Sequence, residues 1–451
     1  MDISKKTSPE LKNRDVLYRL SFLIFGLGNL INGQIARGGI LLGIEIAYIV
    51  YMVKFGVGAI ADFITLGTVE QGQVYNEALG IYEYSKGDNS MLCLLYGVIT
   101  IVLTVAVIIV ARASYKSALC TQLRKERGMK IPTIKDDVRS LKEENLHSIL
   151  LAFPLLGIIV FTVIPLIFMI LIAFTSYDRN HQPPGNLFDW VGLDNFQAMF
   201  AMGGSLAATF WPVLGWTILW AFLATVTNYI LGLLLALLIN RKGTRAKGFW
   251  RFMFVLSIAA PQFVTLLSMR TIFNTNGPIN VILRTFGFIG PTDAIPFLTD
   301  PTLAKITIIL INIWIGVPYT LLSTTGILQN IPGELYEAAK IDGAGTSVIF
   351  RKITLPYMLF VMTPNLITAF TGNINNFNVI YLLTNGGPES MEYYYAGKTD
   401  LLVTWLYKLT ITRKDYNLGA VIGIMTFLIL ATISLLTYRN TGSYKDEGAF
   451  Q

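Results

Sequence analysis

The chain has 451 residues, of which 53% are hydrophobic and only 14% charged, and its formal net charge is +7. Soluble globular proteins carry about a quarter charged residues, so this composition excludes an ordinary soluble domain. Several apolar runs reach the roughly 20 residues that cross a bilayer core, and they are continuous rather than alternating, which excludes a β-barrel. We therefore expect an all-α polytopic membrane protein.

Eight spanning helices are predicted, at about 38–55, 91–113, 150–175, 213–240, 252–273, 303–327, 357–383 and 419–438. The run 20–34 is also apolar, but it is short and rich in Gly and Asn, so it is interpreted as a re-entrant or interfacial segment. With a cytoplasmic N-terminus, eight crossings place most Lys and Arg in cytoplasmic segments, as the positive-inside rule requires. Both termini are therefore expected in the cytoplasm, the N-terminus is read as retained rather than cleaved, and no nucleic-acid partner is expected.

The charge pattern divides the chain into four parts. An N-terminal region, 1–113, holds two spans and the short apolar run, and a basic cytoplasmic linker follows at 114–149. Residues 150–440 form a compact unit of six spans, and a cytoplasmic tail occupies 441–451.

Motifs for catalysis are missing from the sequence. It contains no G-x-x-x-x-G-K-[ST], no H-E-x-x-H and no Cys/His cluster, so we expect no ATP hydrolysis by this chain, no metal and no cofactor. The six downstream spans also lack ionisable residues in their interiors, since Arg270 and Lys305 lie near predicted outer ends. This argues against an ion-coupled symporter, although a sodium site built from backbone carbonyls would escape the test. Glu45, in the first span, is interpreted as paired with a neighbouring helix or snorkelling.

Uncharged polar residues stand out in three of these spans. In the sixth, three of them are spaced i, i+4, i+7 and share one face, and in the seventh two asparagines at i, i+3 do the same. An unpaired amide in hydrocarbon costs a few kcal/mol. Two interpretations stay open: hydrogen bonds between helices, or a neutral polar pocket at the membrane midplane that suits a sugar. The residues are Gln262, Asn312, Gly316, Tyr319, Asn373 and Asn376.

A polar stretch lies between the predicted sixth and seventh spans, "ELYEAAKIDGAGTSVIFRKITLP" at 334–356. Its sequence predicts two short helices. The first begins near Pro332 and carries glutamates at its positive N-terminal end, together with a narrow apolar stripe. Two glycines interrupt it. A second short helix, capped by Thr346 or Ser347, is expected to end near Ile353 before the next span begins.

This stretch fits the pattern E-A-A-x3-G-x9-I-x-L-P at every fixed position. It resembles the EAA loop of importer-type ABC transporter permeases. The resemblance implies a docking element whose helices seat in a cleft of a separate ATPase and transmit its closure. The coupling residues would be Glu337, Ala338, Ala339, Asp342 and Gly343.

Three further stretches, "NIWIGVPY", "INNFNVIYLLTNGGP" and "AGKTDLLVTWLYKLT", resemble the MalF-type maltose/maltodextrin permeases. The resemblance covers roughly 145–440 and implies the six-helix core of a type I ABC importer. Ile258 and Gln262 stand where the family carries aromatic and hydroxyl groups, and Ala369 replaces a small hydroxyl, so the preferred sugar length stays open. The resemblance implies substrate contacts at Asn312, Ile315, Gly316, Tyr319, Asn373 and Asn376.

The resemblance also implies partners. These are a second, MalG-like permease, a homodimeric MalK/MsmK-like ATPase that holds the ATP and Mg, an extracellular sugar-binding lipoprotein, a maltodextrin substrate and membrane lipid. The loop 176–212 replaces a large external domain of enterobacterial members, which suggests the plasma membrane of a Gram-positive bacterium. Alternatives are another neutral oligosaccharide, or a glycerol-phosphate ester, which would need Arg or Lys in the cavity. An ion-coupled sugar symporter should lack the EAA loop, and a glycosyl-transferring enzyme should place acidic residues near a helix end.

Overall fold

The computed structural model describes residues 20–77, 79–201, 203–241 and 243–439. The start of the predicted cytoplasmic N-terminal segment, up to residue 19, and the predicted tail at 441–451 lie outside the described residues. The chain divides into two compact units, the first ending at Gly192 and the second beginning at Leu193. The predicted boundary at 149–150 rests on charge pattern and resemblance, and it stays a prediction.

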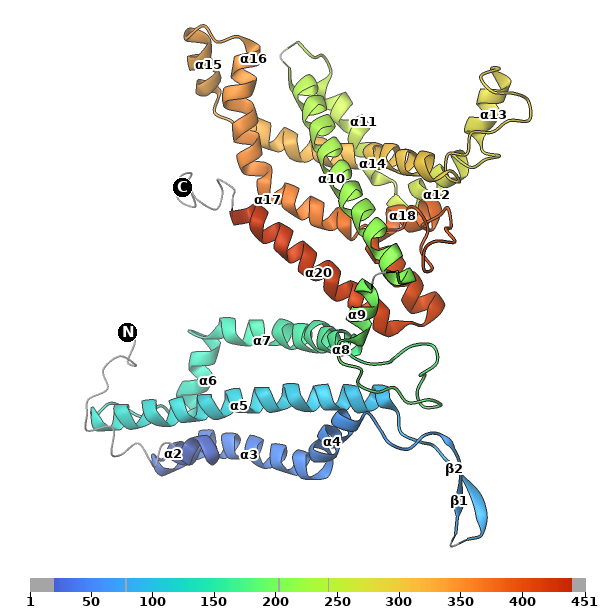
Figure 1. The fold of residues 1–451 in the computed structure, drawn as a ribbon. Coiled ribbons are helices and arrows are strands. Elements are labelled where there is room, and N and C mark those ends of the chain that lie inside the picture. The colour runs from blue at the N-terminus through green and yellow to red at the C-terminus, as the bar shows by residue number, and fades with distance from the viewer. Residues whose placement is uncertain (1–19, 78, 202, 242, 440–451) are drawn as a thin grey trace. The chain divides into compact units, whose positions relative to one another are not determined.

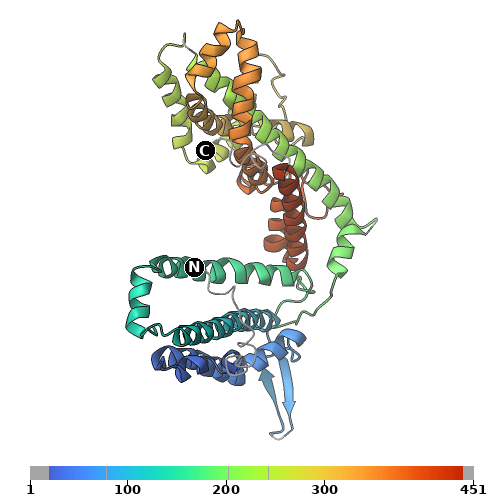
Figure 2. The same ribbon diagram turned by 90° about the vertical axis from the view of Figure 1, so that its left-hand side faces the viewer.

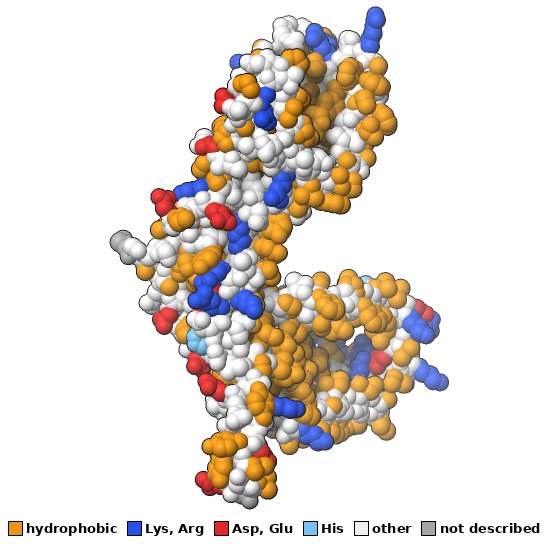
Figure 3. All heavy atoms as spheres, turned by 90° about the vertical axis from the view of Figure 1, so that its right-hand side faces the viewer, with side chains coloured by type: hydrophobic (Ala, Val, Ile, Leu, Met, Phe, Trp, Pro, Cys, Tyr) orange, Lys and Arg blue, Asp and Glu red, His pale blue; other side chains and the backbone are white. Residues whose placement is uncertain are grey.

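The mostly helical membrane fold predicted from composition is confirmed. Among the described residues, seven helices are long and apolar enough to cross a membrane, or eight if one bent pair counts as a single span. Hydrophobic side chains also cover much of the face drawn in Figure 3, as expected where helices contact lipid. The candidate spans are Ile35–Thr65, Ser90–Glu126, Leu146–Ile172, Ser205–Asn240, Pro301–Gln329, Thr346–Thr384 and Tyr416–Arg439, with the bent pair Lys247–Ala259 and Gln262–Ile272.

The first unit is built around the long helix α5, against which α2, α3, α4 and α8 pack (Figure 1). A short helix, α6, connects α5 with α7 along the chain. Its N-terminus is stabilised by a capping box formed by Thr133 and Asp136. The elements are α2 (Leu27–Ile31), α3 (Ile35–Tyr51), a π-helical turn (Met52–Gly56), α4 (Val57–Thr65), β1 (Gly72–Asn76), β2 (Ile81–Ser85), α5 (Ser90–Glu126), α6 (Ile134–Lys142), α7 (Leu146–Ile158), a π-helical turn (Ile159–Val163) and α8 (Ile164–Ile172).

The apolar run 20–34 forms a broken helical segment, and its α2 has only five residues, too few to span a bilayer. Its free backbone groups are met by side chains of the long helices: Glu45 Oε2 accepts the N–H of Phe25 at 2.7 Å, and Ser114 Oγ accepts that of Gly26 at 2.8 Å. This hydrogen bond agrees with the interpretation of Glu45 as a paired group rather than a snorkelling one.

One element was not predicted. The loop after α4, which the sequence predicts to be external, contains a two-stranded antiparallel hairpin, with Gly72 opposite Ser85 and Tyr75 opposite Tyr82. The rings of these two tyrosines lie 5.1 Å apart, a cross-strand aromatic pair that stabilises the hairpin. The fold is thus mostly helical rather than all-α.

In the second unit, α10 packs along α14 and α17 and forms its main core (Figures 1 and 2). Trp220, Leu266, Ile308 and Val379 are fully buried there. The elements are α9 (Asp194–Phe200), α10 (Ser205–Asn240), α11 (Lys247–Ala259), α12 (Gln262–Ile272), α13 (Pro278–Thr285), α14 (Pro301–Gln329), α15 (Gly333–Ile341), α16 (Thr346–Ile349), a π-helical turn (Phe350–Thr354), α17 (Leu355–Ile374), α18 (Phe377–Thr384), α19 (Leu402–Tyr407), a π-helical turn (Lys408–Arg413) and α20 (Tyr416–Arg439).

Two predicted helices differ in detail. The fifth span is bent by 86° between α11 and α12, where Pro261 removes a backbone donor and stands just before the first residue of α12. The second short helix of the coupling stretch is not separate. It continues from α16 through a π-helical turn into α17. Pro356 is the second residue of α17, and its ring would clash with a regular helix preceding it, which the π-helical turn replaces.

Candidate functional site

Asn373 and Asn376 meet at a break in the seventh span. Helix α17 ends at Ile374, and Asn376 is the N-cap of α18, where its Oδ1 accepts the N–H of Val379 at 3.3 Å. Its Nδ2 donates to Asn373 Oδ1 at 3.3 Å. The two amides are therefore brought together by a helix break, not by the shared face of one continuous helix that the sequence predicted.

Two hydrogen bonds connect this break to the polar face of helix α10. Asn373 Nδ2 donates to Thr225 Oγ1 at 3.0 Å, and Trp220 Nε1 donates to the Asn373 carbonyl at 3.1 Å. Three residues beyond Thr225, on the same side of α10, lies Asn228. A Cβ placed on Gly316 of α14 would overlap the amide of Asn228, so only glycine allows this approach. Helix α10 thus presents Thr225 to one predicted contact residue and Asn228 to another.

Two side-chain amides in this region each have one buried atom without a hydrogen-bond partner among the described residues. Asn312 is 5% exposed and its Nδ2 has no partner in the part of the chain that the structure describes. Asn228 Oδ1 is also buried and unpaired there. A buried amide group without a partner costs about 1–3 kcal/mol, so these groups are available to a polar ligand.

The other predicted contact residues are placed differently. Ile315 packs against the buried core around Trp220. Tyr319 is 55% exposed on α14, and Gln262 is exposed as the first residue of α12. Among the described residues, neither side chain hydrogen-bonds to Asn373 or Asn376. Each keeps a free polar group at the surface of the second unit.

Asn228 was missed by the sequence reasoning. It lies in the apolar run "FLATVTNYILG" and is an amide inside a predicted span, as Asn312 is. The same signal would have found it. We call Thr225, Asn228, Asn312, Gly316, Asn373 and Asn376 the amide cluster.

The chemistry of the amide cluster is neutral hydrogen bonding. It contains amide and hydroxyl donors and acceptors and no ionisable side chain. The nearest end of α14 carries Lys305, whose ammonium lies 4.7 Å from the Trp216 ring centre and is held by that cation–π contact. Among the described residues, no group of three His, Cys, Asp or Glu side chains could hold a metal.

The predicted coupling stretch projects from one end of the second unit as α15 and the start of α16 (Figure 1). Helix α15 ends in a Schellman motif: Ala344 N–H donates to the Ala339 carbonyl at 2.8 Å and Gly343 N–H to that of Lys340 at 3.0 Å. Gly343 has φ +77°, a left-handed conformation that favours glycine. Gly345, not the predicted Thr346 or Ser347, is the N-cap of α16.

One side of α15 is anchored and the other is open. Tyr336 packs in the core below, and its hydroxyl lies 3.2 Å from Thr354 Oγ1. Leu335 is 45% exposed and Ile341 86% exposed. An exposed apolar face on a rigidly held helix is a typical docking surface. Of the predicted coupling residues, Ala339 is half-buried and Glu337, Ala338, Asp342 and Gly343 are exposed.

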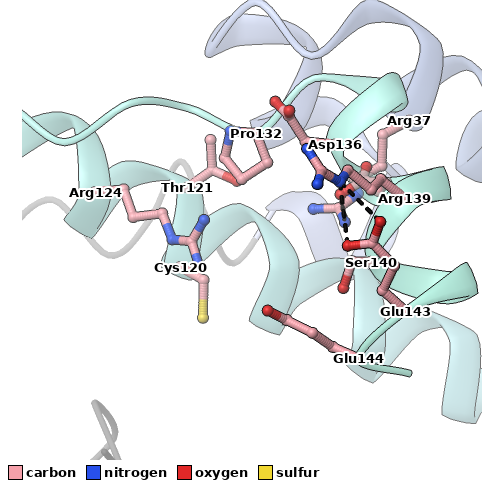
Figure 4. Close-up of a pocket in the computed structure, with 11 residues that line it drawn as sticks. Arg37, Cys120, Thr121, Arg124, Pro132, Asp136, Arg139, Ser140, Glu143 and Glu144 are labelled. Atoms are coloured by element: carbon pink, nitrogen blue, oxygen red, sulfur yellow. Dashed lines mark hydrogen bonds and ion pairs between the residues drawn. The ribbon is translucent and has the colours of Figure 1, made fainter. Parts of the chain in front are cut away.

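The first unit holds a charged hollow of about 590 Å³ between α5, α6 and the start of α3 (Figure 4). Its charges largely pair with each other. Arg37 lies 2.8 Å from Asp137, and Arg139 lies 3.0 Å from Glu143. The Arg37–Asp137 contact fastens α6 of the basic linker to α3, whereas the Arg139–Glu143 pair lies within the linker.

Comparison with known proteins shows to which family the chain belongs. Residues 228–441 match the family model of the binding-protein-dependent transport system inner membrane component. The chain is 34% identical to the maltodextrin transport system permease protein MalC of Streptococcus pneumoniae, over 94% of this chain and 95% of that one. It is 38% identical to the galactooligosaccharides transport system permease protein GanP of Bacillus subtilis, over 80% of this chain and 85% of that one.

The fold is also similar to a solved structure. A bacterial ABC transporter involved in the import of the acidic polysaccharide alginate has a chain that matches with a TM-score of 0.54 at 21% identity, covering 67% of this chain and 96% of that one. The family implies a binding protein, an ATPase and a partner permease as the other importer components. The chain belongs to the family of binding-protein-dependent transport system inner membrane components: it is a multi-pass inner membrane protein and a non-catalytic ABC importer permease for oligosaccharides.

Proposed function

We propose that this chain is the permease subunit of a maltose/maltodextrin importer, in which the amide cluster holds the sugar midway through the membrane. The observation that carries the proposal is that two buried amide atoms, Asn228 Oδ1 and Asn312 Nδ2, have no partner among the described residues, while helix α10, which carries Asn228, also binds Asn373 through Thr225. A sugar supplies many hydroxyl donors and acceptors and no charge, which is what these groups lack. The maltodextrin permease MalC, similar along nearly the whole chain, supports this substrate.

The proposed contacts follow from this arrangement. Asn228 joins the residues expected from the sequence, and the glycine at 316 keeps the α14 backbone close to it. Tyr319 offers an exposed aromatic face, on which a sugar ring packs through its C–H groups. The proposed substrate-binding set is Gln262, Asn312, Ile315, Gly316, Tyr319, Asn373 and Asn376, with Asn228 added.

The energy of ATP would be transmitted to this chain through the coupling stretch at α15 and α16. In the proposed assembly, the exposed face of α15 seats in a MalK/MsmK-like ATPase dimer, and closure of that dimer moves α16 and α17 as one continuous helix. A MalG-like permease and an extracellular lipoprotein complete the importer, in the plasma membrane of a Gram-positive bacterium with both termini in the cytoplasm. ATP binding opens the cavity outward and hydrolysis returns it inward.

Uptake by the reconstituted complex tests this function. Proteoliposomes that contain this chain, its partner permease, the ATPase and the binding protein should accumulate radiolabelled maltotriose in an ATP-dependent way. The variant Asn376→Ser keeps an N-cap residue for α18 but removes the amide, and it should lower uptake by at least about tenfold, the effect of losing roughly 1.4 kcal/mol of binding. Unchanged uptake in Asn376→Ser, with the complex assembled, would contradict the site.

A galactooligosaccharide importer is the second candidate, because GanP is 38% identical over 80% of this chain. Both sugars are neutral, so the amide cluster alone favours neither. Competition decides between them: excess unlabelled maltotriose should suppress labelled uptake far more than excess galactobiose. The reverse order would assign the chain to galactooligosaccharides.

A further inference from the structure

The segment between α18 and α20 folds around an open pocket of about 880 Å³, on the predicted outer side of the second unit. This volume falls within the roughly 300–1,000 Å³ of small-molecule sites. It is lined by residues of α18, of α19, of the loop between them and of the π-helical turn after α19, together with Ser205 of α10. None belongs to the amide cluster. Five of the lining residues are tyrosines: Tyr381, Tyr393, Tyr394, Tyr395 and Tyr407.

A row of aromatic rings connects this outer tyrosine pocket with the amide cluster. Phe377 directly follows Asn376 and stacks on Tyr381, one turn further along α18, with ring centres 4.8 Å apart and planes at 20°. Tyr407 of α19 packs edge-on against both rings, at 5.0 and 5.3 Å. Helix α18 has eight residues and so is about 12 Å long. The row therefore links the two polar regions over about one short helix.

Tyr395 is held in the pocket at a conformational cost. Its φ is +52°, a left-handed backbone conformation that is rare for a bulky residue. Half of its side chain is exposed, and the Arg413 guanidinium lies 4.0 Å from its ring centre. Backbone strain of this kind persists where surrounding contacts fix it and is frequent at ligand sites. The loop thus fixes an aromatic ring that remains half-exposed.

Contacts behind the pocket supply that rigidity. Asp400 is fully buried and accepts hydrogen bonds from the Gly397 N–H at 2.7 Å and the Thr404 hydroxyl at 2.8 Å. The Tyr394 backbone N–H donates to Thr209 Oγ1 of α10 at 2.7 Å. The pocket wall is therefore tied to the helical core rather than formed by a free loop.

Three cations at or beside the pocket are each paired with a carboxylate. Lys408 lies 2.6 Å from Asp400, Lys398 lies 2.9 Å from Glu392, and Arg413 lies 3.6 Å from Asp415. Burial raises the pKa of Asp400 and the Lys408 ammonium opposes this. The pair has no net charge whichever partner holds the proton. An anionic sugar would find these cations already paired, whereas a neutral sugar needs only aromatic faces and hydroxyl partners such as the exposed Glu389.

We propose that the outer tyrosine pocket is a second carbohydrate subsite, which holds one end of a neutral oligosaccharide against its tyrosine rings before the sugar reaches the amide cluster. The proposal rests on the proposed function of that cluster. Sugar rings present C–H groups that pack on aromatic faces, and their hydroxyls bond to the acceptors around the rim.

Transport kinetics of the complete reconstituted complex test the subsite, with maltotetraose as the probe. Tyr395→Ala removes the exposed ring and should raise KM by about twofold to tenfold, since an aromatic contact is worth roughly 0.5–1.5 kcal/mol, while the maximal rate stays unchanged. Tyr395→Phe keeps the ring and should behave as the unmodified chain does. If Tyr395→Ala assembles poorly, Tyr393→Ala on the same pocket provides the second variant, with the same expected rise in KM.

Three outcomes would overturn the subsite. The first is an unchanged KM in the alanine variants while the unmodified chain still takes up sugar. This result would contradict a subsite in the outer tyrosine pocket, but not substrate binding at the amide cluster. A weaker affinity of the alanine variants for the sugar-free binding protein, with KM for sugar unchanged at saturating binding protein, would assign the pocket to protein docking instead. Absence of any maltodextrin or galactooligosaccharide uptake by the unmodified complex would overturn both proposals.

Discussion

The two units of this protein differ in how their buried side-chain amides are bonded. In the first unit, both ends of the Gln34 amide are bonded: its Oε1 accepts hydrogen bonds from Asn29 Nδ2 at 2.6 Å and Thr121 Oγ1 at 3.0 Å, and its Nε2 donates to the Pro132 carbonyl at 2.8 Å. Among the described residues of this unit, Asn29 Oδ1 is the buried side-chain atom without a partner. In the second unit, Asn228 Oδ1 and Asn312 Nδ2 are buried and have no partner among the described residues.

The second unit also leaves apolar groups uncovered at its coupling end, where Ile341 of α15 is 86% exposed. Polar groups bonded to each other hold a fold together, whereas unpaired amides and an exposed apolar helix are completed by something outside the chain. Changes in the first unit should therefore act on stability, and changes in the second on transport.

Gly343→Val should have the largest effect on transport. Valine at φ +77° costs about 1–2 kcal/mol and would disturb the Schellman motif that ends α15. We expect maltotriose uptake to fall by roughly tenfold or more, because about 1.4 kcal/mol corresponds to a factor of ten, with the complex still assembled. ATP hydrolysis would no longer respond to sugar-loaded binding protein, as measured by phosphate release.

Gly345→Ala is the matched control for the coupling end. Its φ is −71°, and an added Cβ would meet no atom within 4 Å, so both uptake and stimulated hydrolysis should stay near those of the unmodified chain. Equal losses in the two variants would show that any added bulk at this surface blocks docking, and would remove the role of the left-handed turn.

Asn312→Leu should separate stability from transport within the second unit. Leucine is similar in size and removes a buried amide that has no partner, so thermal stability should stay equal or rise by about 1 kcal/mol. Uptake should nevertheless fall by about fivefold to tenfold, because the sugar loses one hydrogen-bonding group worth about 1 kcal/mol. A marked drop in melting temperature with unchanged KM would mean that Asn312 is a structural group, as in the first unit.

Gln34→Leu should have the smallest effect on transport. The change leaves Asn29 Nδ2 and Thr121 Oγ1 without their shared acceptor in a buried site, which should destabilise the first unit by about 2 kcal/mol. KM for maltotriose should remain within about twofold, since this hydrogen-bond network contains none of the proposed contacts. Thermal unfolding of the detergent-solubilised complex and initial uptake rates measure the two effects. A large change in KM would abolish the contrast between the units.

The sequence by itself determined the class and the outline of this protein. Apolar length and the placement of Lys and Arg predict helical spans because both follow from the cost of burying polar groups in lipid. The helix end at Gly343 was also predictable, since glycine and its neighbours carry a local signal. The amides at 312, 373 and 376 stood out because each lies in an otherwise apolar run.

Only the tertiary structure decided how those residues meet. The break between α17 and α18, which joins Asn373 to Asn376, depends on bonds from Thr225 and Trp220 of α10, about 150 residues earlier in the chain. The approach of Asn228 to Gly316 likewise needs two helices packed side by side. The outer tyrosine pocket is held to α10 by the hydrogen bond from the Tyr394 N–H to Thr209 Oγ1. Contacts of this kind join residues far apart in sequence, so no local pattern encodes them.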